Sequence, residues 1–192
     1  MESSRRFSLI LIPILALGLF LFRACKNGNN LSQEDKAVLM QEADSLQQAI
    51  ESNWASLLQA DDQMQYNLNS LVQVLTAEEV ISENESDSLT AAVQALGPLR
   101  RDMESMRSEA ITAYDDAWLE LSANLMDLPG ESPSPATIGI LEGLNEYINN
   151  DILGLRVAYD QTARAYNQWY LDHGDKLSDS ALRAKYLLFS LE

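Results

Sequence analysis

A long run without proline or glycine is the feature that most constrains how this chain can fold. Neither residue occurs between Leu31 and Gly97. Within that run, apolar residues recur at steps of three, four or seven, which is the period of a helix that buries one face. These apolar positions are Leu39, Ala43, Leu46, Ile50, Leu57, Met64, Leu68, Leu71 and Leu75. We therefore predict one helix that begins after an N-cap at Ser32 and ends near Thr76.

A second apolar stripe of the same period spans residues 89–128. The polar stretch 83–87 is expected to form the turn between the first helix and the second. The pair Gly97-Pro98 interrupts the stripe once, and it predicts a kink because proline removes a hydrogen bond from the helix.

The last third of the chain predicts two more helices. A loop rich in proline and glycine covers 129–135, and an apolar stripe then runs from 138 to a C-cap at Gly174. A short final helix is expected over 179–191. Since no segment alternates with period two, the fold class is all-α. Residues 33–192 should form an antiparallel bundle of three long helices plus a short C-terminal helix.

The first residues of the chain are typical of a membrane segment. Residues 7–22 carry no charged side chain. As a helix they would span about 24 Å, and the flanking Arg6 and Arg23 can extend toward the membrane surface. We expect an uncleaved single-pass anchor over 1–25, which a transmembrane helix at 7–22 would form. A short polar linker over 26–32 should follow it.

A lipoprotein signal is the alternative for this region. Cys25 is the single cysteine and follows Ala24, but Arg23 stands where such a signal has a small uncharged residue. Lysine and arginine nearly balance on the two sides of the segment, so the positive-inside rule leaves the orientation open. We expect a protein of the cell membrane, with the periplasmic side favoured for the bundle.

Composition and motifs exclude several functions. The chain has 13 Lys and Arg against 29 Asp and Glu, a formal net charge of −16, so a nucleic-acid binder that neutralises phosphates is excluded. The single histidine, His173, has no glutamate three residues before it, which excludes a di-iron bundle site. No phosphate-binding loop or nucleophile motif occurs. We predict no catalytic residue, no metal and no cofactor.

One carboxylate lies where an apolar residue is expected. Asp61 falls on the first stripe, and a buried carboxylate needs a partner, for which Arg156 or Arg164 is the candidate. The doublets Asp61-Asp62 and Asp115-Asp116 also allow the alternative of a hydrolase that works with carboxylates. Adjacent helical residues point about 100° apart, so a solvated acidic face is the simpler interpretation of each doublet.

Residues 150–167 resemble the signature helix of the LemA family, which reads roughly E-N-x-I-x-x-x-R-x-x-Y-N-x-x-V-x-x-Y-N. The matching positions are Asn150, Ile152, Arg156, Tyr159, Tyr166 and Asn167, while Asp160 replaces the first Asn of the pattern. Trp54 also precedes Ser70-Leu71-Val72 at the family's spacing. The family's arginine pair and its Phe-Pro after the signature are missing. The resemblance implies one N-terminal membrane segment and an antiparallel bundle, with no established activity.

The signature residues also have a physical interpretation. Tyr159 and Tyr166 are seven residues apart on the core seam, and a buried tyrosine needs a partner for its hydroxyl. With Arg156 and Asn167 they predict a polar network that fixes helix register, and the alternative is a groove for a ligand or partner. Together with Trp54 and Asp61, these are the candidate site residues.

We therefore expect a membrane-anchored, non-enzymatic binding or scaffold module of the bacterial envelope, whose partners are other membrane or envelope proteins. A ligand-sensing bundle and a lipoprotein with the same fold are the alternatives.

Overall fold

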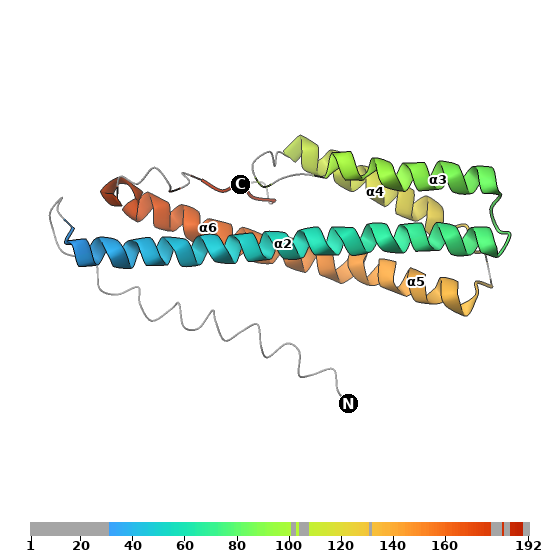
Figure 1. Ribbon diagram of the computed structural model, residues 1–192, viewed down its shortest axis with the longest axis horizontal. Helices are drawn as coiled ribbons and strands as arrows, with labels where there is room; N and C mark the ends of the chain where they lie inside the picture. The colour runs from blue at the N-terminus through green and yellow to red at the C-terminus, as the bar shows by residue number, and fades with distance from the viewer. Residues whose placement is uncertain are drawn as a thin grey trace, which may run out of the picture.

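The chain folds into a bundle of helices (Figure 1). The computed structural model describes residues 31–100, 103, 108–130, 132–177, 182 and 185–189, and every regular element within them is helical. The elements are α2 (Gln33–Ala77), α3 (Glu83–Ala95), η2 (Gly97–Leu99), α4 (Ser108–Met126), α5 (Pro135–Glu146), η3 (Tyr147–Asp151) and α6 (Ile152–Leu177). The all-α prediction is confirmed.

Helix α2 is the axis of the bundle, and it contacts α3, α4, α5 and α6. Its 45 residues correspond to about 68 Å of helix. Ser32 caps its first turn as predicted: the Ser32 hydroxyl accepts the Asp35 N–H at 3.0 Å, and the Asp35 carboxylate accepts the Ser32 N–H at 3.3 Å. The predicted end near Thr76 is also confirmed.

The turn after α2 lies earlier than predicted. Residues 83–87 begin α3 instead of forming the turn, because Ser82 accepts the Glu85 N–H and Glu85 accepts the Ser82 N–H in a second capping box. The turn itself uses Glu79 in the left-handed conformation, with φ of 57°. The chain therefore reverses direction within a few residues, and α3 packs against the C-terminal half of α2 (Figure 1).

The predicted second helix over 89–128 is two helices, α3 and α4, which lie side by side (Figure 1). Pro98 lies in the short 3₁₀ turn η2, and Arg100 leaves it in an extended conformation with ψ of 138°. The helix breaks where only a kink was expected, since Arg100 turns toward α2 and bonds Asp62 there.

The predicted third helix is one long rod, antiparallel to α2, made of α5, the π-helical turn η3 and α6 (Figure 1). Ser134 caps its start and Pro135 takes the first position. The expected C-cap at Gly174 is wrong, because α6 continues to Leu177. Gly174 is buried inside the helix, where an added Cβ would lie 2.9 Å from the Tyr170 ring.

The predicted short helix over 179–191 is wrong for the residues that the structure describes there. Residues 185–189, here called the C-terminal strap, are non-helical and lie along α6, running back toward its start (Figure 1). The strap does not form a helix because side chains of α6 bond its main-chain groups at Tyr186 and Phe189.

The predicted membrane segment and the lipidation candidate lie outside the residues that the structure describes. They are residues 7–22 and Cys25. Within the described ranges, no helix combines the length and the apolar character that crossing a bilayer requires.

Candidate functional site

The six residues singled out from the sequence fall into two neighbouring groups in the structure. Asp61 belongs to a polar cluster between α2, α4 and η3. The other five residues line the seam between α2 and α6, where the C-terminal strap is bound. These five are Trp54, Arg156, Tyr159, Tyr166 and Asn167.

Asp61 is a buried carboxylate that accepts a hydrogen bond from a tyrosine. The Tyr147 hydroxyl lies 2.6 Å from Asp61 Oδ1, and the Arg100 guanidinium Nε lies 3.8 Å from Oδ2. Arg100 also bonds Asp62 at 2.5 Å and donates to the Leu58 carbonyl. The predicted pairing of Asp61 with Arg156 or Arg164 is wrong, because η2 brings Arg100 to this position instead.

Burial sets the proton affinity of this pair. Burial raises the pKa of Asp61, against the opposing effects of the Tyr147 hydrogen bond and the Arg100 charge. Burial also raises the pKa of Tyr147, and the nearby Asp61 charge raises it further. Tyr147 therefore stays a neutral donor, and the bond fastens η3 to α2.

Arg156 forms a bidentate ion pair with Asp115 and so joins α6 to α4. Its Nη1 lies 2.7 Å from Asp115 Oδ2, and its Nη2 lies 2.5 Å from Oδ1. The Trp118 indole N–H donates to the same carboxylate at 3.4 Å. Both side chains of the pair are only 21% exposed. This geometry is the strong form of an arginine–carboxylate bond.

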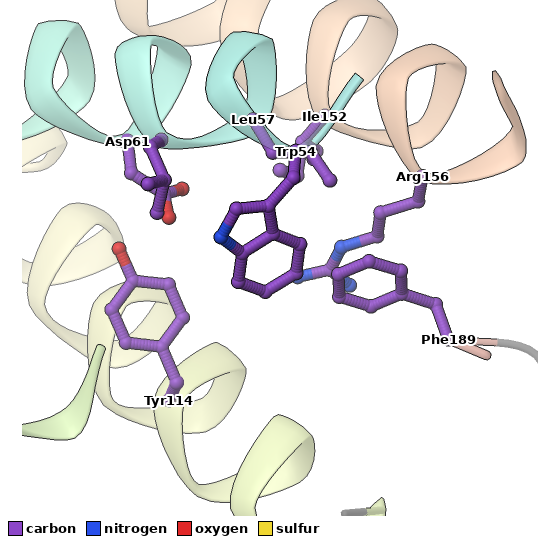
Figure 2. Close-up of a pocket in the computed structure, with 8 residues that line it drawn as sticks. Trp54, Leu57, Asp61, Tyr114, Ile152, Arg156 and Phe189 are labelled. Carbon is purple, nitrogen blue, oxygen red and sulfur yellow. The ribbon is translucent and has the colours of Figure 1, made fainter. Parts of the chain in front are cut away.

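Aromatic rings surround the end of the strap. The Phe189 ring centroid lies 5.5 Å from that of Tyr159 and 6.1 Å from that of Trp54. The Tyr159 and Trp54 centroids lie 5.6 Å from each other. The Arg156 guanidinium carbon lies 5.0 Å from the Phe189 centroid. Figure 2 shows the Trp54 indole between the Asp61 side and the Phe189 side of this region. The strap therefore supplies part of the aromatic core.

A small cavity separates the two groups. It measures about 30 Å³, which is room for about one water molecule. The lining residues are Trp54, Leu57, Leu58, Asp61, Tyr114, Ile152, Arg156 and Phe189. The Tyr114 hydroxyl points toward Asp61 across it (Figure 2). A larger hollow of about 290 Å³ lies between α3 and α4, where the carboxylate of Glu85 already serves the Ser82 cap.

Side chains of α6 bond the main chain of the strap. The Asn167 amide accepts the Tyr186 N–H at 2.7 Å and donates to the Tyr186 carbonyl at 2.8 Å. The Asp160 carboxylate accepts the Phe189 N–H at 2.8 Å. Asn167 was expected in a network between helices, whereas the structure shows it bonded to the strap.

Tyr166 is completely buried between α2 and the strap. Gln47 of α2 donates to its hydroxyl at 3.4 Å, and the Tyr186 ring meets the Tyr166 ring edge-on with centroids 5.0 Å apart. One turn earlier, the Asn53 amide of α2 bonds the Thr162 hydroxyl at 3.1 Å. Polar residues of α2 thus bond α6 at these two levels of the seam.

The sequence reasoning missed the strap residues Tyr186 and Phe189, and also Tyr147, Asp160 and Arg100. The spacing of Tyr186 and Phe189 fits one face of a helix, so the sequence predicts them on the final helix and not on an extended strap. The pair Tyr159-Asp160 is followed seven residues later by the similar pair Tyr166-Asn167. That repeat is the signal from which two equivalent polar positions on one face of α6 could have been found.

No family model, curated protein or solved structure matches this chain. Within the described ranges, no three acidic, histidine or cysteine side chains converge as metal ligands.

Proposed function

We propose that this chain is a non-enzymatic binding module of the LemA type, tethered to a cell membrane of the bacterial envelope by residues 7–22. The tether rests on the uncharged run between Arg6 and Arg23, and the LemA relationship rests on the signature in 150–167. An anchor of this kind would hold the bundle beside other envelope proteins.

The observation that carries the proposal is the α2–α6 seam, which already holds an extended piece of polypeptide. The strap is bound through its main chain at Tyr186 and Phe189 and through the rings of both residues. Extended segments are commonly recognised in this way, with the main chain giving affinity and side-chain pockets giving specificity. The seam is therefore a surface on which another protein segment can be bound.

The polar cluster supports a structural frame more than a reaction. The carboxylates of Asp61, Asp62 and Asp115 accept hydrogen bonds from Tyr147, Arg100 and Arg156 respectively. A hydrolase using Asp61 requires a carboxylate of raised pKa, which burial gives Asp61, and also a substrate pocket beside it. The adjoining cavity of about 30 Å³ compares with about 300–1,000 Å³ for small-molecule sites.

Partner capture tests this function in living cells. A photo-crosslinking residue placed at Leu171, which lies one turn after Asn167 on α6 and is 76% exposed, should give one defined adduct with an envelope protein. The same residue at Tyr66, which is 67% exposed on α2, is the matched control and should give none. Equal labelling at both positions, or no adduct at either, would contradict the proposal.

Membrane attachment is tested separately. Leu15→Arg places a charge in the middle of the segment and should move the protein to the soluble fraction, while Asn29→Arg in the polar linker should not. Cys25→Ser should leave attachment unchanged. If Cys25→Ser releases the chain from the membrane, the lipoprotein alternative is correct and the anchor is wrong.

A further inference from the structure

We infer that the α2–α6 seam binds an extended segment of a partner protein that carries two aromatic side chains three residues apart, and that the C-terminal strap occupies this groove as a built-in competitor. The inference rests on the proposed function as a binding module, and it specifies the partner and its regulation.

Main-chain recognition is the first step of the inference. Asn167 bonds both the N–H and the carbonyl of one residue, Tyr186, and Asp160 accepts the N–H of Phe189. These contacts do not depend on which side chains the bound segment carries. They require only an extended chain, because a helix would use the same main-chain groups internally. The groove therefore accepts extended segments in general.

Two aromatic positions supply the specificity. The Tyr186 ring packs edge-on against Tyr166, and the Phe189 ring packs against Tyr159 and under the Arg156 guanidinium. Each contact favours an aromatic side chain over an aliphatic one. The preferred segment therefore reads aromatic-x-x-aromatic.

One position between the aromatic residues is only partly covered. Leu187 is 36% exposed, in contrast to the buried Tyr186. A partner segment can therefore vary at this position without losing the contacts of the groove.

The contacts that hold the strap come from side chains of the helices. Its release therefore breaks no hydrogen bond of the helix ladders, but it uncovers the Tyr159 and Tyr166 rings, which a partner segment would cover again. Residues 178–184 connect the strap to the end of α6, so a released strap stays close to the groove and competes at roughly millimolar effective concentration.

Charge favours a foreign partner over a second copy of this chain. The formal net charge of −16 makes two copies repel each other, whereas a basic segment is attracted. We therefore assign the groove to a basic segment of another protein.

A peptide-binding experiment tests the inference on the full chain purified in detergent. The probe is a fluorescent peptide with the sequence of residues 182–191, and its control replaces both aromatic residues with alanine. The protein variants are Tyr186→Ala/Phe189→Ala, which removes the ring contacts of the strap and so favours its release (the emptied groove), and the same variant with Asn167→Ala added. Circular dichroism checks that each variant is folded, and Phe189→Ala alone is the milder substitute if the double variant is not.

The emptied groove should bind the probe at least about tenfold more tightly than the wild type, because the apparent affinity of the wild type is reduced by the fraction of molecules in which the strap has left the groove. Adding Asn167→Ala should weaken binding about tenfold through two lost hydrogen bonds, and the alanine control should not bind. In the wild type, saturating probe should speed amide exchange at Tyr186 and Phe189. Equal binding by wild type and emptied groove, or no effect of Asn167→Ala, would overturn the inference.

Analytical ultracentrifugation distinguishes a foreign partner from a second copy of this chain as the occupant of the groove. If the wild type forms dimers that Tyr186→Ala/Phe189→Ala abolishes, the groove holds the strap of a second copy and the foreign partner is wrong. Adduct formation at Leu171 in cells is a readout independent of the probe. If the adduct forms in cells but the purified chain does not bind the probe, the proposed function stands and this inference is wrong. If the chain binds the probe but no adduct forms, the groove binds peptides as inferred and the proposed function is wrong.

Discussion

The ion pair between Arg156 and Asp115 gives the sharpest stability prediction. It is the bidentate contact that joins α6 to α4 in this structure, with oxygen–nitrogen distances of 2.7 and 2.5 Å. Arg156→Met keeps the apolar stem and removes the charge, and Asp115→Asn keeps an acceptor for Trp118. Each single change leaves one partly buried charge without its partner, whereas the double change leaves none.

The expected magnitudes follow from burial. Breaking a fully buried pair costs about 3–5 kcal/mol, and the 21% exposure of both side chains reduces this to about 2 kcal/mol for each single variant. The double variant should lose only about 1 kcal/mol, since no uncompensated charge remains. The two single losses together should thus exceed the double loss by about 3 kcal/mol, which is the coupling of the pair.

Urea unfolding of the four proteins, followed by far-ultraviolet circular dichroism, measures these free energies. Each single variant should also melt about 4–8 °C below the wild type. Glu120→Gln is the matched control, because Glu120 is an exposed carboxylate on the same helix as Asp115, and its neutralisation should change stability by no more than about 0.5 kcal/mol. Additive effects of Arg156→Met and Asp115→Asn would refute the structural role of the pair.

Three further predictions address the remaining features. Burial raises the pKa of Asp61 above its usual 3.8, so the stability that this group contributes is present in acid and is lost as pH rises through its folded pKa. Asp61→Asn should remove this pH-dependent loss and raise the melting temperature at pH 7. If Asp61→Asn lowers the melting temperature more at pH 7 than at pH 4, the prediction is contradicted. Tyr166→Ala should lower the unfolding free energy by about 3–5 kcal/mol because the ring is fully buried. Tyr166→Phe removes only the hydroxyl that Gln47 bonds and should lower it by no more than about 1.5 kcal/mol. Denaturant titrations that give equal losses for the two variants would refute the buried-ring interpretation. Leu15→Arg should cost the membrane segment about 2.5–3.5 kcal/mol of insertion free energy, measured as the fraction recovered with membranes, and full retention would count against the anchor.

The long helices were predictable because their signals are local. The stripe of α2 and the Ser32 cap depend on spacing and on residues within one turn, and both appear in the structure. The start of α3 was missed although its signal was present, since Ser82 and Glu85 form the same capping pattern. The polar composition of residues 83–87 predicts a turn, but in the structure these residues form the first turn of a helix.

The strap and the polar partners were not predictable from local signals. The apolar spacing of residues 182–189 fits a helix, but contacts with α6 outweigh that local preference. The partner of Asp61 depends on where the chain goes after Pro98, and nothing near Arg100 in the sequence indicates that it returns to α2. Contacts between distant segments thus determine which residues meet at the site, while the apolar periodicity determines where the long helices form.

Amide hydrogen exchange on the full chain tests most directly whether the seam binds the strap by its main chain. We predict that the Tyr186 and Phe189 amides exchange slowly, because Asn167 and Asp160 accept their protons. Asn167→Ala should make the Tyr186 amide exchange faster while the amides inside α2 keep their protection. Exchange of both strap amides at the rate of an unfolded peptide in the wild type, or no change with Asn167→Ala, would contradict the claim.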